Sequence, residues 1–277
     1  MLTAAVENHA ALARITALGL IAARRAREQG PDRLAAVVTG VQLAAIAQAV
    51  AGVEAMLTEQ DLDSASEGDV LPVAFAGFAS DGRDLDSLLR LADTDWQFDM
   101  IVRTQLADVA RAAAATSMAS RPAVTGYTRM VTAGACSRCV ILAGKWFAWN
   151  DGFERHPGCN CDHVPVGDRP EGHLISDPRE HFDRLSREEQ DRTFTVAGAE
   201  AIRRGADMNQ VVNARRGMQT AQIAGRQVVA TLEGTARRGV GRDYRESTRI
   251  MPETILSIAE DRDDALRMLR LYGYITT

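Results

Sequence analysis

All four cysteines of this chain fall within residues 136–161. They form two pairs, Cys136-Ser-Arg-Cys139 and Cys159-Asn-Cys161, and His156 and His163 flank the second pair. A C-x2-C pair presents two sulfurs from one tight turn to a single tetrahedral zinc ion, and thiolate and imidazole are ligands that suit zinc. The cluster therefore predicts a local cross-link around which the middle of the chain must fold.

The candidate zinc ligands outnumber the four that a closed structural site needs. The sequence does not decide between four thiolates and three thiolates with one imidazole, and we expect His163 to lie outside the ligand set, on the surface. Disulfide bonds would also suit an even number of cysteines if the chain ended up outside a cell, and unpaired core thiols are a third interpretation. The candidates are Cys136, Cys139, His156, Cys159 and Cys161.

Alanine, the strongest helix former, is frequent on both sides of the cluster and absent from residues 149–196. Apolar residues recur at helical spacing in 3–29 and from 34 onward, and a further helix is expected over about 85–117. Ser186 and Glu189 predict a capping box that opens a helix running to Arg204, with Gly205 at its end, and a last helix is expected over about 252–271.

These patterns predict a mainly α-helical protein in three regions. Residues 1–122 form a helical N-terminal region, and residues 123–175 form a zinc-knuckle module with short strands, one of them near 127–132. Residues 176–277 form a helical, arginine-rich C-terminal region. The net charge of −5 and 46% hydrophobic residues are ordinary for a globular protein and exclude collagen-like, disulfide-scaffold and wholly disordered classes.

Residues 34–53 carry no charge and are long enough to cross a bilayer. Gln42, Gln48 and the abundant alanines would make a membrane position costly. We therefore expect a buried helix rather than a membrane span. The first residues also lack the basic start and cleavage site of a secretory signal.

Arginine supplies all but one of the 32 basic residues, the exception being Lys145, which suggests a GC-rich coding genome more than a specific chemistry. Residues 198–250 contain ten arginines and five acids. Clustered arginines can neutralise DNA phosphates, although a mixed-charge helical surface is the plainer interpretation in an acidic chain. The candidate DNA contacts are Arg203, Arg204, Arg215, Arg216, Arg237 and Arg238.

No nucleotide-binding loop, zinc-protease motif or nucleophile elbow is present in the sequence. His9, His173 and His181 stand alone and are expected on the surface, so the sequence does not assemble a catalytic triad from them. A metal-dependent nuclease would need His156 or His163 as its catalytic histidine. We therefore expect no catalysis, with a phage-borne metal-dependent enzyme as the alternative.

The central residues resemble the signature of phage Mu F-like minor head morphogenesis proteins, most closely the form found in phages of actinobacteria. The resemblance begins with Cys136-Ser-Arg-Cys139 and Gly144, continues through His156-Pro-Gly-Cys159-Asn-Cys161 and Pro165, and extends to about Met218, a third of the chain. The N-terminal helices match only in general character.

The resemblance implies a minor capsid protein that acts in head assembly and in DNA packaging or ejection. It implies the portal protein and the major capsid protein as partners, with packaged DNA as a further candidate partner through the arginines above. It would reside inside the capsid or at the portal vertex, after assembly in the host cytoplasm. Related proteins are often labelled capsid maturation proteases, but no protease signature can be placed on this sequence. The family's metal positions transfer to Cys136, Cys139, His156, Cys159 and Cys161, with structural zinc as the implied cofactor.

Overall fold

The computed structural model describes residues 2–79, 83–149, 159, 161–168, 177–215, 219–223, 226–231, 249–250, 258–260, 264, 267–268 and 271. The chain divides into two compact units, one formed by Met1–Ala135 with Ala143–Ser176 and one by Cys136–Leu142 with Asp177–Thr277. The described part is mainly helical, as the sequence predicts. In this division the central strands share a unit with the N-terminal helices.

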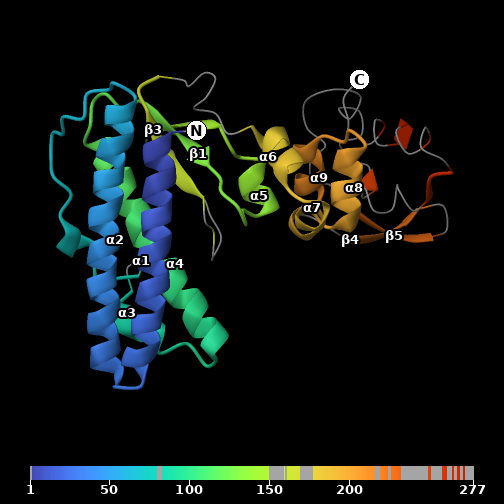
Figure 1. The fold of residues 1–277 in the computed structure, drawn as a ribbon. Helices are drawn as coiled ribbons and strands as arrows, with labels where there is room; N and C mark the ends of the chain where they lie inside the picture. Colours follow the sequence, from blue (N-terminus) through green and yellow to red (C-terminus); the bar gives the residue numbers. More distant parts are fainter. Residues whose placement is uncertain are drawn as a thin grey trace. The chain divides into compact units, whose positions relative to one another are not determined.

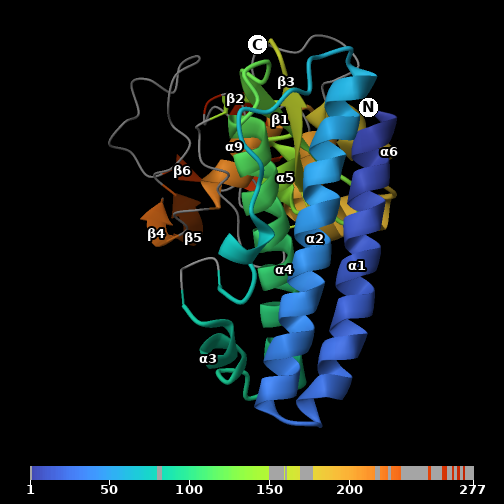
Figure 2. The same ribbon diagram turned by 90° about the vertical axis from the view of Figure 1, so that its left-hand side faces the viewer.

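Three long helices, α1 (Thr3–Arg27), α2 (Pro31–Glu59) and α4 (Asp95–Ala119), lie side by side in the first unit (Figures 1 and 2). Gly30 adopts a φ of 111° between α1 and α2, and Pro31 occupies the first turn of α2, where its missing N–H costs nothing. The two helices expected from the apolar spacing are therefore confirmed, and the tight turn makes them an antiparallel hairpin.

Helix α2 contains the uncharged segment of residues 34–53 and is long and apolar enough to cross a membrane by length and composition. Core helices of soluble proteins pass the same test. Ile46 and Ala49 of α2 are buried in one cluster with Val109 and Ala113 of α4. These contacts are those of a core helix, and the absence of a membrane span stays a prediction.

The helix expected over residues 85–117 is instead two helices, and this prediction is wrong at its start. Helix α3 (Leu85–Leu89) ends before a short connection, and α4 begins after Thr94. The Thr94 hydroxyl accepts from the Gln97 N–H, and the Gln97 side chain accepts from the Thr94 N–H, which makes a capping box. The cap satisfies the free backbone N–H groups at the start of a helix, so a new helix can begin after Thr94.

A three-stranded antiparallel sheet joins this helical bundle, with β1 (Gly126–Met130) between β2 (Trp146–Ala148) and β3 (Asp162–Val166). The strand expected near 127–132 is confirmed as β1. Tyr127, Met130 and Val164 of the sheet are buried in one cluster with Val53 and Met118 of α2 and α4. Strand β3, which follows the second cysteine pair directly, is thereby fixed against the helices.

The second unit contains α5 (Ser137–Val140), α6 (Pro178–Arg184), α7 (Arg187–Phe194), α8 (Val196–Arg203) and α9 (Met208–Ala214). The capping box at Ser186 and Glu189 is confirmed, and Gly205 has a φ of 96° after α8. The single helix expected from 187 to 204 is interrupted at Thr195, whose φ of 65° ends α7 while its hydroxyl caps α8. Phe182 and Phe194 are both fully buried and pack edge to face.

The C-terminal region, expected to be helical, contains a sheet that the sequence analysis did not predict in addition to helices α6 to α9. Strands β4 (Gln219–Ile223), β5 (Arg226–Thr231) and β6 (Arg249–Ile250) form an antiparallel sheet there. Two residues separate β4 from β5, the second of them Gly225, and such spacing is typical of a tight hairpin. Most of the helix expected over residues 252–271 lies outside the described residues.

The close approach of α1 and α2 generates a testable difference between two glycines of α2. A methyl group at Gly52 would overlap the buried amide of Asn8, whereas a methyl at Gly40 would meet nothing within 4 Å. We expect Gly52→Ala to lower the free energy of unfolding by about 1–3 kcal/mol because of overpacking. Gly40→Ala should leave it unchanged or raise it by up to about 1 kcal/mol through helix propensity. Chemical denaturation measures both, and equal effects of the two changes would contradict the packing described here.

Candidate metal centre

The two cysteine pairs occupy different kinds of local structure. Cys136 is the residue before α5 and Cys139 lies within that short helix, so one helical turn presents both sulfurs, 3.4 Å apart. Cys159 and Cys161 lie just before β3, with their sulfurs 2.8 Å apart. None of the four cysteines forms a disulfide. The C-x2-C and C-x-C spacings thus each bring two donors together locally.

Three buried cysteines, Cys139, Cys159 and Cys161, lie close enough to bind one metal ion. Their sulfurs are all within 4.8 Å of one another. A tetrahedral ion with metal–sulfur bonds of about 2.3 Å would hold its sulfurs about 3.8 Å apart. The donor set is soft and shielded from water, which fits a structural ion such as zinc better than a hard cation. It is the one group of three or more metal-competent side chains among the residues that the structure describes.

The backbone of the second cysteine pair is held by a buried arginine of α4. The Arg111 Nε donates to the Cys161 carbonyl at 3.0 Å, and its Nη2 donates to the Cys159 carbonyl at 2.6 Å. Only 5% of Arg111 is exposed. Because one planar guanidinium contacts both carbonyls, the two cysteines are kept in a fixed relation to each other.

A second buried arginine lies beside the sulfur itself. The Arg129 Nη1, on β1, is 3.8 Å from the Cys161 sulfur, and its guanidinium carbon is 5.6 Å from the centre of the Phe147 ring. A guanidinium stabilises negative charge on a neighbouring sulfur, and metal ligation requires the thiolate form. The position of Arg129 therefore favours a charged, metal-binding Cys161 over a neutral core thiol, while Arg111 holds the backbone of the pair.

The histidines are placed differently from the sequence expectation. His163 is buried with its ring edge to face against Tyr127, so the expectation of a surface position is wrong. His156 lies outside the described residues, as does His173. His181 is half-buried, and burial, aided by the nearby Arg184, lowers its pKa. The choice between Cys136 and His156 as a fourth ligand therefore stays a prediction.

His9 is also not an isolated surface residue. It lies on α1, where Nδ1 contacts the Asp162 carboxylate at 2.5 Å and Nε2 contacts the Thr132 hydroxyl at 3.1 Å. Asp162 is the first residue of β3 and follows Cys161 directly. Sequence reasoning missed His9, Thr132 and Asp162, as it missed Arg111 and Arg129, because partners 32 to 153 residues away leave no local spacing pattern.

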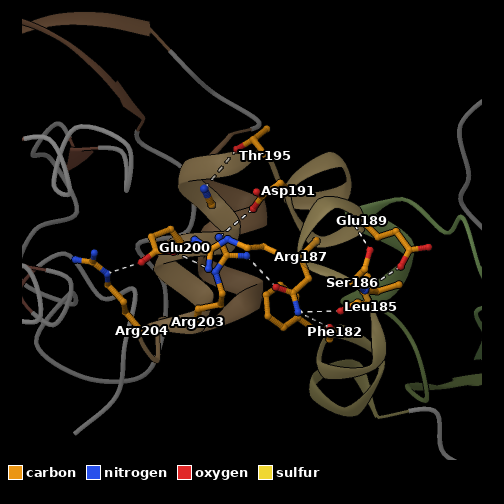
Figure 3. A network of polar contacts seen from close by, with 12 residues as sticks. Phe182, Leu185, Ser186, Arg187, Glu189, Asp191, Thr195, Glu200, Arg203 and Arg204 are labelled. Carbon is orange, nitrogen blue, oxygen red and sulfur yellow. Dashed lines mark hydrogen bonds and ion pairs between the residues drawn. The ribbon is translucent and has the colours of Figure 1, made fainter.

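The arginines proposed from the sequence to contact DNA fall into two groups. Arg203 pairs with Asp191 at 3.0 Å and Glu200 at 3.1 Å, and Arg204 pairs with Glu200 at 2.9 Å (Figure 3). Arg215 donates to the Thr195 hydroxyl. Arg216, Arg237 and Arg238 lie outside the described residues. Arg203 and Arg204 are thus parts of a network that joins α7 to α8, and phosphate binding by them would have to replace carboxylate partners.

No family model, curated protein or solved structure matches this chain. The geometry of the site therefore carries the functional argument.

The two buried arginines generate a test of the centre. We expect the purified protein to contain about one zinc ion per chain, and Cys161→Ser to lose it.

Replacing Arg111 by Lys keeps the charge but loses the fork that contacts both carbonyls, so zinc affinity should fall by about 10–100-fold. Competition with a chromophoric chelator measures the affinity. Arg25→Lys, at an exposed position of α1, is the control and should match the wild type. An unchanged zinc affinity of Arg111→Lys would contradict the role assigned to Arg111 in holding the two cysteine carbonyls.

The α7–α8 network generates a pH prediction. The hydrogen bond from Arg204, with further contributions from Arg203, holds the pKa of Glu200 below its usual value of 4.5. A carboxyl whose pKa is lowered by folding stabilises the fold above its unfolded pKa, and this stabilisation is lost as pH falls through the folded pKa. We expect Glu200→Gln to lower the melting temperature at pH 7, and the difference from wild type to shrink at about pH 3. Glu188→Gln, an exposed carboxyl on α7, should show no such pH-dependent difference.

Proposed function

We propose that this chain is a minor capsid protein of a tailed phage, acting in head morphogenesis. The observation that carries the proposal is the meeting of the two halves of the cysteine signature, with the sulfurs of Cys139, Cys159 and Cys161 within 4.8 Å of one another. The sequence resemblance rests on these same residues. Local spacing alone brings together the members of each pair, but a shared metal site also requires the pairs to converge.

In this proposal the metal is structural zinc, and its ligands are Cys139, Cys159 and Cys161 with Cys136 or His156 as the fourth. When bound, the metal would supply folding free energy to the segments that carry its ligands. The sulfur of Cys136 is 3.4 Å from that of Cys139 but lies outside the group of three sulfurs within 4.8 Å of one another, so it would have to move toward Cys159 and Cys161 to close the shell. A closed shell leaves no position for a reactive water, which favours a structural role over the alternative of a metal-dependent nuclease or protease.

The proposed partners are the portal protein and the major capsid protein, with the protein inside the capsid or at the portal vertex. Packaged DNA is a further proposed partner through the arginine-rich C-terminal region. Since Arg203 and Arg204 already neutralise carboxylates, any DNA binding should be weak and should fall steeply with salt.

The position of the protein in particles tests the proposal. We expect mass spectrometry of purified, DNA-filled particles from the phage or prophage that encodes the chain to find it in few copies relative to the major capsid protein. A Cys139→Ser, Cys161→Ser double variant should reduce the yield of filled heads, whereas Ser137→Ala, within the same C-x2-C turn, should not. A protein found only in the unassembled host fraction would overturn the assignment.

A further inference from the structure

Three side chains from distant parts of the first unit form a continuous hydrogen-bonded chain. His9 comes from the first turns of α1, Thr132 follows β1, and Asp162 begins β3. The Thr132 hydroxyl is 3.1 Å from His9 Nε2, and the Asp162 carboxylate is 2.5 Å from His9 Nδ1. Hydroxyl, imidazole and carboxylate thus stand in the order of nucleophile, base and orienting acid.

The partner of each nitrogen of the His9 ring decides whether the imidazole can act as a base toward the Thr132 hydroxyl. A carboxylate at Nδ1 accepts a hydrogen bond from the N–H of that nitrogen, which keeps the proton there and leaves the Nε2 lone pair directed at the hydroxyl. An imidazole held in this way can take the hydroxyl proton as a bond to carbon forms. We propose that Thr132, His9 and Asp162 form a hydrolytic site that cleaves an acyl bond, an ester or an amide, in a substrate with a small apolar acyl group.

A pocket of about 270 Å³ beside the histidine indicates the substrate class. His9 and Asp162 line it, Leu12, Leu106 and Ala110 supply apolar walls, and Arg103 and Arg111 also line it. Its volume is below the range of about 300–1,000 Å³ typical of sites for drug-sized ligands. The pocket therefore suits a short acyl chain or a single apolar side chain. The side chains of His9 and Asp162 remain 22% and 14% exposed, so the imidazole and the carboxylate are accessible from the pocket. Thr132 is half-buried and is not among the residues that line the pocket, so the scissile carbonyl would have to lie at the pocket's edge, beside the Thr132 hydroxyl.

The reaction proceeds in two balanced steps. The Thr132 oxygen attacks the carbonyl carbon while its proton passes to His9 Nε2, and the bond from that carbon to the leaving oxygen or nitrogen breaks as the leaving group takes the proton from Nε2. Water then attacks the acyl-threonine ester, giving one proton to Nε2, and the Thr132 oxygen leaves with that proton. Asp162 stays ionised throughout and stabilises the imidazolium. The net change is consumption of one water, and no step passes through the metal.

The experiment uses the full-length, metal-loaded chain and p-nitrophenyl acetate and butyrate as probes. We expect turnover above that of an equal concentration of free imidazole. Thr132→Val, which removes the hydroxyl and keeps the shape, should lower the rate by at least about 100-fold, and Asp162→Asn by at least about 10-fold. Thr125→Val, at an exposed position just before the same strand β1, is the matched control and should keep the wild-type rate.

Covalent labelling of the wild-type protein provides a second readout, which does not depend on whether a variant folds. A fluorophosphonate or β-lactone probe should modify the peptide that contains Thr132, and Thr132→Val should not be labelled. Turnover no faster than free imidazole, turnover that survives in a folded Thr132→Val protein, or label on another residue would each overturn the proposal. If the wild-type protein shows no turnover and Asp162→Asn lowers the melting temperature, the three residues stabilise the packing of α1 against the sheet and do not catalyse hydrolysis.

Discussion

The contact between the Arg111 guanidinium and the carbonyls of Cys159 and Cys161 connects most of the features described here. It joins the middle of a long helix to the turn that carries two of the candidate ligands. Burying a guanidinium is costly unless its donors are satisfied, and two carbonyls with the buried Asp108 nearby at 3.8 Å supply that satisfaction. The position of the cysteine turn is therefore set by the helical bundle as well as by any metal.

The same turn places groups with different chemistry on either side of Cys161. Its sulfur lies by Arg129, while the next residue, Asp162, contacts His9 of α1. Strand β3 continues from Asp162 and packs through Val164 against α2 and α4. A single short segment thus links a candidate structural metal, a candidate hydrolytic site and the core.

Local patterns predicted what depends on local contacts. The break at Gly30 and Pro31, the capping box at Ser186 and the cap at Gly205 are confirmed because each is decided within a few residues. The missed break before Thr94 was also local, since Thr94 and Gln97 form a capping box that the sequence displays. The helix expected over residues 187–204 breaks at Thr195, and strands β4 and β5 were not predicted within the region expected to be helical.

The sequence by itself determined a mainly helical chain with two cysteine pairs, because periodicity, capping and C-x2-C spacing act over a few residues. Tertiary structure alone decided that Cys139, Cys159 and Cys161 converge, that two of the arginines support the cysteine turn, and that His9 meets Thr132 and Asp162. These meetings depend on how helices and sheet pack, and packing is set by the summed burial of many side chains. No spacing in the sequence encodes that summed burial. The type of a residue therefore does not show which distant residue it will contact in the fold.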